Sequence, residues 1–136
     1  MSLYDLVDGP PLLLDLVTPL KAAAEKMLRI EADAAVVVEP TGGVAGLITA
    51  REFLHAIASG AGSDLDPVED WMSLDPATEQ GDRHVHHLVC DLVDRGATHI
   101  VVLDGKLPVG LLTVGKLRAA SRVVWGSLQT PSTDFP

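Results

Sequence analysis

The sequence predicts an α/β (α+β) fold made of two similar halves, each with short strands and amphipathic helices. A shift of 65 positions along the 136-residue chain places Leu3–Val7 on Val68–Met72 and Pro11 on Pro76. Helix and strand patterns then follow in the same order in both halves. A half of about 60 residues buries only part of its apolar surface, so we expect the two halves to share one core.

The repeat also predicts the domain boundaries. Residues 3–58 form the first repeat, and residues 67–125 form the second. Residues 59–66 between them are polar and glycine-rich, which is typical of a linker. We expect residues 126–136 to be an irregular tail, because this segment has two prolines and few core-forming residues.

The first elements of each half are a short helix, a short strand at Pro11 or Pro76, and a longer amphipathic helix. Apolar residues in the longer helix recur at the spacing that places them on one helical face. Thr18 as an N-cap and Pro19 as the first helical residue open the first of these helices, whereas Asp82 caps the second and Gly96 ends it. The two apolar stripes consist of Leu20, Ala23, Ala24, Met27 and Leu28, and of Val85, Leu88, Val89, Leu92 and Val93.

A pair of strands follows the amphipathic helix in each half. The first strand is a short β-branched run that ends in an acid, and a glycine-bearing turn connects it to the second, as a hairpin requires. The last helix of each half starts after Thr49 or Thr113 and runs to about Ser59 or about Trp125. The strand pairs are Ala35–Glu39 with Gly46–Thr49, and Ile100–Asp104 with Gly110–Thr113.

The composition restricts the function. Hydrophobic residues make up 47% of the chain, which favours a folded core. No apolar stretch approaches the roughly 20 residues of a membrane span, and no secretory signal is expected. The net charge of −9 argues against a broad nucleic-acid surface, which needs clustered lysine and arginine. The single cysteine, Cys90, excludes an internal disulfide and suits a reducing compartment, so the expected location is the cytoplasm.

The ordered motifs resemble a known family. Val68–Met72 followed by Asp75-Pro76, the segment Gly96–Asp104, and the strands Gly46–Thr49 and Gly110–Thr113 are together similar to the tandem CBS (cystathionine β-synthase) domain pair, or Bateman module. The resemblance implies two CBS repeats, each a small mixed sheet with helices packed on it, related by a pseudo-twofold.

The same resemblance implies a regulatory module with no catalytic residues and no covalent cofactor. Such modules bind an adenosyl ligand such as AMP, ADP, ATP or S-adenosylmethionine in clefts between the repeats. They commonly form homodimers and regulate an effector domain or protein, which here would lie outside this chain. Ligand-independent dimerisation or protein interaction is the alternative function.

For the first half, the resemblance implies that Thr49 and Glu52 hold the ribose and that Leu13 and Ala34 line the adenine pocket. A carboxylate can accept hydrogen bonds from both ribose hydroxyls. Glu52 stands where the family has aspartate, which changes its reach by one methylene. Thr49 and Glu52 also have the spacing of a capping box, and both roles are compatible. The favoured interpretation of Leu13 and Ala34 is that they are simply core residues.

For the second half, the corresponding positions are Thr113 and Lys116 for the ribose, and Thr78 and His99 for the adenine. An ammonium group has three donors and no acceptor, so Lys116 cannot hold a diol as a carboxylate does. Two interpretations of Lys116 stay open: a phosphate contact helped by Arg118 or Arg122, or a solvated basic helix face.

A histidine cluster suggests a metal site and a third hypothesis, a metal-dependent hydrolase. On a continuous helix, His84, His87 and Asp91 would lie on the face opposite the apolar stripe. No ligand from a second element is recognisable, which favours a solvated helix face and no metal site. Cys90 matches no nucleophile pattern, and the expected role is that of a partly buried helical residue.

Overall fold

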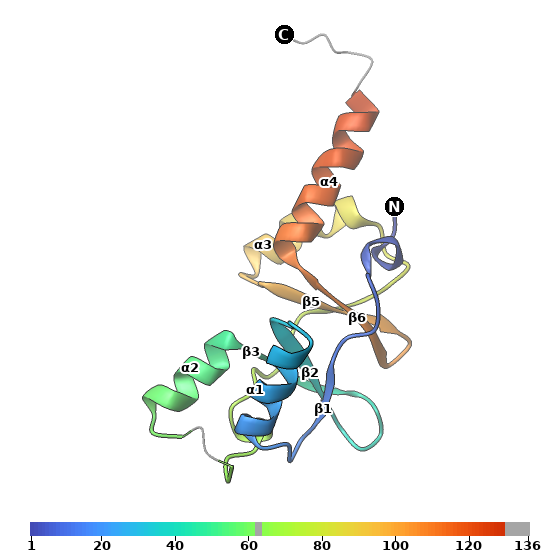
Figure 1. Ribbon diagram of the computed structural model, residues 1–136. Coiled ribbons are helices and arrows are strands. Elements are labelled where there is room, and N and C mark those ends of the chain that lie inside the picture. Colours follow the sequence, from blue (N-terminus) through green and yellow to red (C-terminus); the bar gives the residue numbers. More distant parts are fainter. Residues whose placement is uncertain (62–63, 130–136) are drawn as a thin grey trace. The chain divides into compact units, whose positions relative to one another are not determined.

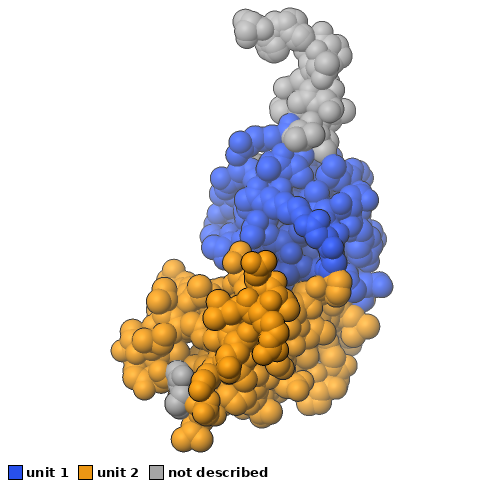
Figure 2. All heavy atoms as spheres, viewed as in Figure 1, with its two compact units in different colours: residues 1–9, 77–104, 109–136 blue, residues 10–76, 105–108 orange. Residues whose placement is uncertain are grey.

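The computed structural model describes residues 1–61 and 64–129, with the side chains of His87, Cys90 and 123–129 outside the described part. The chain folds into two compact units, drawn in different colours in Figure 2. Unit 1 contains Met1–Gly9, Ala77–Asp104 and Val109–Pro136, and unit 2 contains Pro10–Pro76 and Gly105–Pro108. The compact units therefore differ from the two consecutive repeats.

Unit 2 is built on a three-stranded sheet with the order β1-β2-β3 (Figure 1). Strand β1 pairs parallel to β2, with Leu13 opposite Val36, and β2 pairs antiparallel to β3, with Ala34 opposite Thr49. Buried side chains of β2 and β3 pack with α1 and α2, because the β-branched run and the helical stripe each present an apolar face. The elements are β1 (Leu13–Asp15), α1 (Leu20–Arg29), β2 (Ala34–Val38), β3 (Val44–Thr49), α2 (Ala50–Ala58) and the 3-10 helix η2 (Val68–Asp70).

Unit 1 repeats this topology with the sheet order β4-β5-β6. Strand β4 pairs parallel to β5, with Thr78 opposite Val101. Its core includes Leu92, Ile100 and Leu117, which are fully buried. The elements are η1 (Leu3–Leu6), β4 (Thr78–Gln80), η3 (Val85–His87), α3 (Val89–Asp94), β5 (His99–Asp104), β6 (Leu107–Thr113) and α4 (Val114–Gln129). These sheets and helices confirm the predicted α+β architecture.

The opening segment of each repeat packs in the unit that holds the other repeat's sheet. Leu3 is fully buried in the core of unit 1, and its amide donates to the carbonyl of Arg83 at 3.0 Å. In unit 2, Val68 is fully buried, and its amide donates to the carbonyl of Thr18 at 2.8 Å. The two contacts are equivalent under the 65-residue shift. Leu3 therefore belongs to the core of unit 1.

A side chain just after each opening segment packs against a glycine of the neighbouring strand: Val7 against Gly110, and Met72 against Gly46. A Cβ on Gly110 would lie 2.5 Å from Cγ2 of Val7, and a Cβ on Gly46 would lie 2.6 Å from Sδ of Met72. Strands β6 and β3 therefore need glycine where the opening segment crosses them.

Several predicted helix boundaries were wrong. Helix α1 has Pro19 as its N-cap, so Thr18 lies one residue too early for that role. The helix expected after Asp82 is divided into η3 and α3, and Asp82 lies in the preceding turn. The opening helices are single 3-10 turns. Helix α4 continues to Gln129, past the expected end at Trp125, so the first residues of the predicted irregular tail are helical. Residues 130–136 of that tail lie outside the described part.

Candidate functional site

Three of the four candidate residues of the first half meet where β2 begins and α2 starts. Ala34 and Thr49 are opposite each other in the antiparallel pair, and Glu52 lies in the first turn of α2. Leu13 is on β1, opposite Val36, two residues further along β2. Ala34 is buried at 6% exposure, as a core residue is, whereas Leu13 is 46% exposed and does not belong to the core.

Thr49 and Glu52 form a capping box. The amide and the hydroxyl of Thr49 each donate to Oε1 of Glu52 at 2.6 Å. The Thr49 hydroxyl oxygen also accepts from the amide of Arg51 at 3.2 Å. Because both bonds to the carboxylate use Oε1, the second carboxylate oxygen, Oε2, stays outside the capping box. The capping interpretation is therefore confirmed, and it leaves one acceptor atom for a ligand.

The equivalent position in the second half carries the opposite charge. The hydroxyl of Thr113 accepts from the amide of Lys116 at 3.0 Å, which caps the start of α4. Nζ of Lys116 lies 2.5 Å from Oδ2 of Asp8, and the two side chains are 39% and 89% exposed. Lys116 is thus ion-paired to a carboxylate from the start of the chain. No phosphate contact with Arg118 or Arg122 is needed to explain its position.

Thr78 and His99 lie on neighbouring strands of unit 1. Thr78 is the first residue of β4 and is exposed, and His99 is the half-buried first residue of β5. Nδ1 of His99 is 2.9 Å from the hydroxyl of Thr98. The amide of Val114 donates to the carbonyl of Thr98 at 2.9 Å, so the start of β5 and the start of α4 lie side by side.

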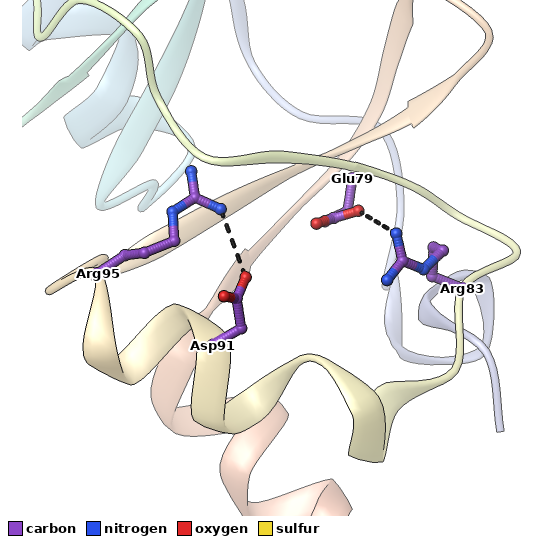
Figure 3. A network of polar contacts seen from close by, with 4 residues as sticks. All are labelled: Glu79, Arg83, Asp91 and Arg95. Atoms are coloured by element: carbon purple, nitrogen blue, oxygen red, sulfur yellow. Dashed lines mark hydrogen bonds and ion pairs between the residues drawn. The ribbon is translucent and has the colours of Figure 1, made fainter.

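The predicted single helical face of the histidine cluster does not form. His84 precedes η3, and α3 starts only at Val89, so the spacing of His84, His87 and Asp91 does not follow one helix. Asp91 instead pairs with Arg95 at 3.7 Å, one turn further along α3 (Figure 3). Among the described residues, no group of three or more His, Cys, Asp or Glu side chains could hold a metal ion.

A second ion pair in Figure 3 lies next to Thr78. Nη1 of Arg83 lies 3.2 Å from Oε2 of Glu79, whose side chain is only 16% exposed. This ion pair connects β4 to the turn before η3. We assign it a structural role because its two residues are only four positions apart in the same local segment.

Asp8 is a candidate residue that the sequence analysis missed. It is separated from Lys116 by 108 positions, so no local pattern connects the two. The available signal was the repeat itself, which aligns Val7 with Met72. Both of these residues pack against a strand glycine, Val7 against Gly110 of β6, and Asp8 directly follows Val7.

The comparisons with known proteins concern the family and the fold of the chain. Residues 3–59 match the CBS domain family. The first repeat is a CBS domain, and the chain has the fold of a CBS domain pair. No curated protein matches the chain at a significant level.

Three solved CBS domain structures show the likeness of fold. A CBS domain protein from Pyrobaculum aerophilum, solved as a complex with AMP, is 18% identical with a TM-score of 0.80, over 93% of this chain and 99% of that one. The CBS domain of a membrane protein from Sphaerobacter thermophilus is 21% identical with a TM-score of 0.78, over 88% and 86%. The CBS domain pair of protein MJ0100, in complex with 5′-methylthioadenosine and S-adenosyl-L-methionine, is 19% identical with a TM-score of 0.77, over 88% and 98%.

Within residues 1–61 and 64–129, no helix combines the length and the apolar character that crossing a bilayer requires.

Proposed function

We propose that this CBS domain pair is a regulatory module that binds an adenosyl ligand, such as AMP, ADP, ATP or S-adenosylmethionine, at the half that contains Thr49 and Glu52. The single observation that carries the proposal is the carboxylate of Glu52 in the first turn of α2, with Oε2 outside the capping box. A ribose diol needs such an acceptor. Solved CBS domain pairs in complex with AMP and with S-adenosyl-L-methionine support the choice of ligand class.

Ala34 and Leu13 extend the proposed site. Ala34 is opposite Thr49 and leaves no bulky side chain at the start of β2, and the exposed side chain of Leu13 offers an apolar surface to a base. The module is proposed to be non-catalytic, and it would regulate an effector domain or protein outside this chain. A location in the cytoplasm stays a prediction.

The test is calorimetric titration of the four adenosyl ligands into wild type and Glu52→Gln. Glutamine keeps the capping box, since its side-chain oxygen still accepts from Thr49, but it replaces the free acceptor with a donor. We expect affinity to fall at least about tenfold, in line with the loss of a hydrogen bond to a charged group. Glu25→Gln on the exposed part of α1 is the matched control and should bind like wild type.

A ligand variant separates ribose recognition from other contacts. The 2′,3′-dideoxy analogue of AMP lacks both hydroxyls and should bind wild type as weakly as AMP binds Glu52→Gln. Equal affinity for AMP and its dideoxy analogue would contradict the assigned role of Glu52.

Self-association is a second candidate function, favoured by exposed apolar side chains on the helices of unit 2. Leu28 on α1 is 79% exposed, and Leu54 and Ile57 on α2 are 67% and 65% exposed. Leu54 and Ile57 are three residues apart and therefore lie on the same side of α2, and exposed apolar side chains that lie together are typical of an interface. We propose a homodimer through this surface, and light scattering of wild type and Leu54→Glu would test it. A monomeric wild type would remove this candidate.

A further inference from the structure

Two histidines lie side by side where η3 begins in unit 1. The ring centroids of His84 and His86 are 5.6 Å apart, and the ring planes meet at 64°. Both side chains are exposed. The sequence pattern suggested a different set, His84 with His87 and Asp91, whose helical spacing does not form. The structure instead brings together the two histidines that flank Val85.

The residue between the two histidines holds the backbone of this segment in place. The side chain of Val85 is buried in the core of unit 1. Its amide donates to the carbonyl of Met1 at 3.1 Å, and its carbonyl accepts from the amide of Leu88 at 3.1 Å, which closes the 3-10 turn. His84 has an extended backbone and forms an antiparallel bridge with Ser2. Because the backbone that carries both rings is already fixed, it loses little conformational freedom when both rings bind one ligand.

The distance between the rings suits two ligands of one metal ion. A bond from zinc to an imidazole nitrogen is about 2.0–2.1 Å long, so two rings on one ion have centroids about 5 Å apart at tetrahedral or neighbouring square-planar positions. The observed separation of 5.6 Å is close to this value, and exposed side chains close the difference by small rotations about their own bonds. Imidazole suits Ni²⁺, Cu²⁺ and Zn²⁺, whereas Mg²⁺ and Ca²⁺ prefer oxygen ligands.

We propose that His84 and His86 chelate a divalent transition-metal ion, such as Ni²⁺, Cu²⁺ or Zn²⁺, with water at the remaining positions. Among the side chains that the structure describes, no group of three or more His, Cys, Asp or Glu could hold an ion, so the site uses two of them. The metal site lies in unit 1, whereas Thr49 and Glu52 belong to unit 2. The inference is therefore independent of the proposed adenosyl site.

The experiment is calorimetric titration of Ni²⁺ into the metal-free protein without any adenosyl ligand. His84→Gln and His86→Gln should each lower the affinity for Ni²⁺ at least about tenfold, because even the loss of a ligand's hydrogen-bond partner costs about 10–100-fold. His55→Gln, on the exposed part of α2, is the matched control and should bind like wild type. In proton NMR spectra, small amounts of paramagnetic Ni²⁺ should broaden the imidazole signals of His84 and His86 before that of His55.

Three results would overturn the inference. Equal Ni²⁺ affinity in wild type and in a folded His84→Gln or His86→Gln variant would show that the two rings do not act together. A loss of affinity confined to His87→Gln would place the ion on another residue. Binding of Mg²⁺ as tight as that of Ni²⁺ would indicate attraction to the acidic chain in place of chelation by imidazole. Far-ultraviolet circular dichroism checks that each variant is folded.

Discussion

Glu31 and Gly96 occupy equivalent positions one residue after the C-caps of α1 and α3, and both have a left-handed backbone, with φ of 56° and 70°. In both cases the next amide reaches back to the helix: Ala32 donates to the carbonyl of Met27 at 2.8 Å, and Ala97 donates to that of Leu92 at 3.1 Å. The two ends form the same Schellman motif, but only one has the residue that this backbone favours.

Replacing Glu31 with glycine should therefore stabilise the protein. Glycine removes the steric cost of positive φ, and part of the gain is offset by the greater freedom of the unfolded chain. We expect the free energy of unfolding to rise by about 0.5–1 kcal/mol and Tm to rise by about 2–5 °C, measured by calorimetry. The control is Glu25→Gly inside α1, which should destabilise by about 1 kcal/mol. A lower Tm for Glu31→Gly would contradict the strain at this position.

Gly110→Ala should be destabilising because the new Cβ would overlap both Cγ atoms of Val7, at 2.5 and 2.6 Å. Overpacking of this kind costs about 1–3 kcal/mol, measured by denaturant unfolding. Gly115→Ala, at the start of α4, is the control. The new Cβ would meet only the Thr113 hydroxyl, at 3.9 Å, so this helical position should tolerate or favour alanine. If both variants unfolded at the same denaturant concentration, the packing of Val7 on β6 would be wrong.

Tyr4, the only tyrosine, reports on how the start of the chain packs. Its ring covers Gly81, where a Cβ would overlap it, and the pKa of its phenol is raised by desolvation and by Asp104 and Asp82, including a hydrogen bond to Asp104. Ultraviolet titration of tyrosinate should give a pKa above 10.0 in the folded protein. Asp104→Asn should lower it, while Asp5→Asn should not.

The direction of the pH dependence follows from this raised pKa. The folded protein holds the phenolic proton more tightly than the unfolded chain, so the contribution of Tyr4 to stability is complete below the unfolded pKa of 10.0. It is lost as the pH rises through the higher folded value. Wild type should thus lose more stability than Tyr4→Phe on going from pH 9 to pH 11, a range chosen about one unit either side of the tyrosine reference value. Equal losses of stability in wild type and Tyr4→Phe would show that the Tyr4 phenol does not interact with Asp104 and Asp82 as described.

Thr49→Ala should weaken the start of α2. The substitution removes the hydroxyl that donates to Glu52 and accepts from Arg51, and loss of an N-cap costs about 0.5–2 kcal/mol. Hydrogen exchange should be faster at the first amides of α2 and unchanged in α1. Thr41→Ala, in the exposed turn between β2 and β3, should leave the α2 amides as in wild type.

The local elements of each half could be predicted because their signals lie close together in the sequence. The apolar stripe of α1 and the buried run of β2 depend only on periodicity and β-branching, and both elements formed where expected. Leu28, which the stripe included, is nevertheless 79% exposed. Gly96 was assigned as a helix end from its residue type alone, and it has the predicted role. The capping box of Thr49 and Glu52 was likewise visible in a four-residue pattern.

The errors arose where short segments depend on distant partners. The sequence by itself determined the repeat, the strands, the glycine cap and the charge difference between Glu52 and Lys116, because these are properties of neighbouring residues. Only the tertiary structure decided that Leu3 and Val68 are buried in the unit that holds the other repeat's sheet, and that Asp8 contacts Lys116. A segment of four or five residues is apolar enough to cover either sheet, so its place depends on packing against the finished core.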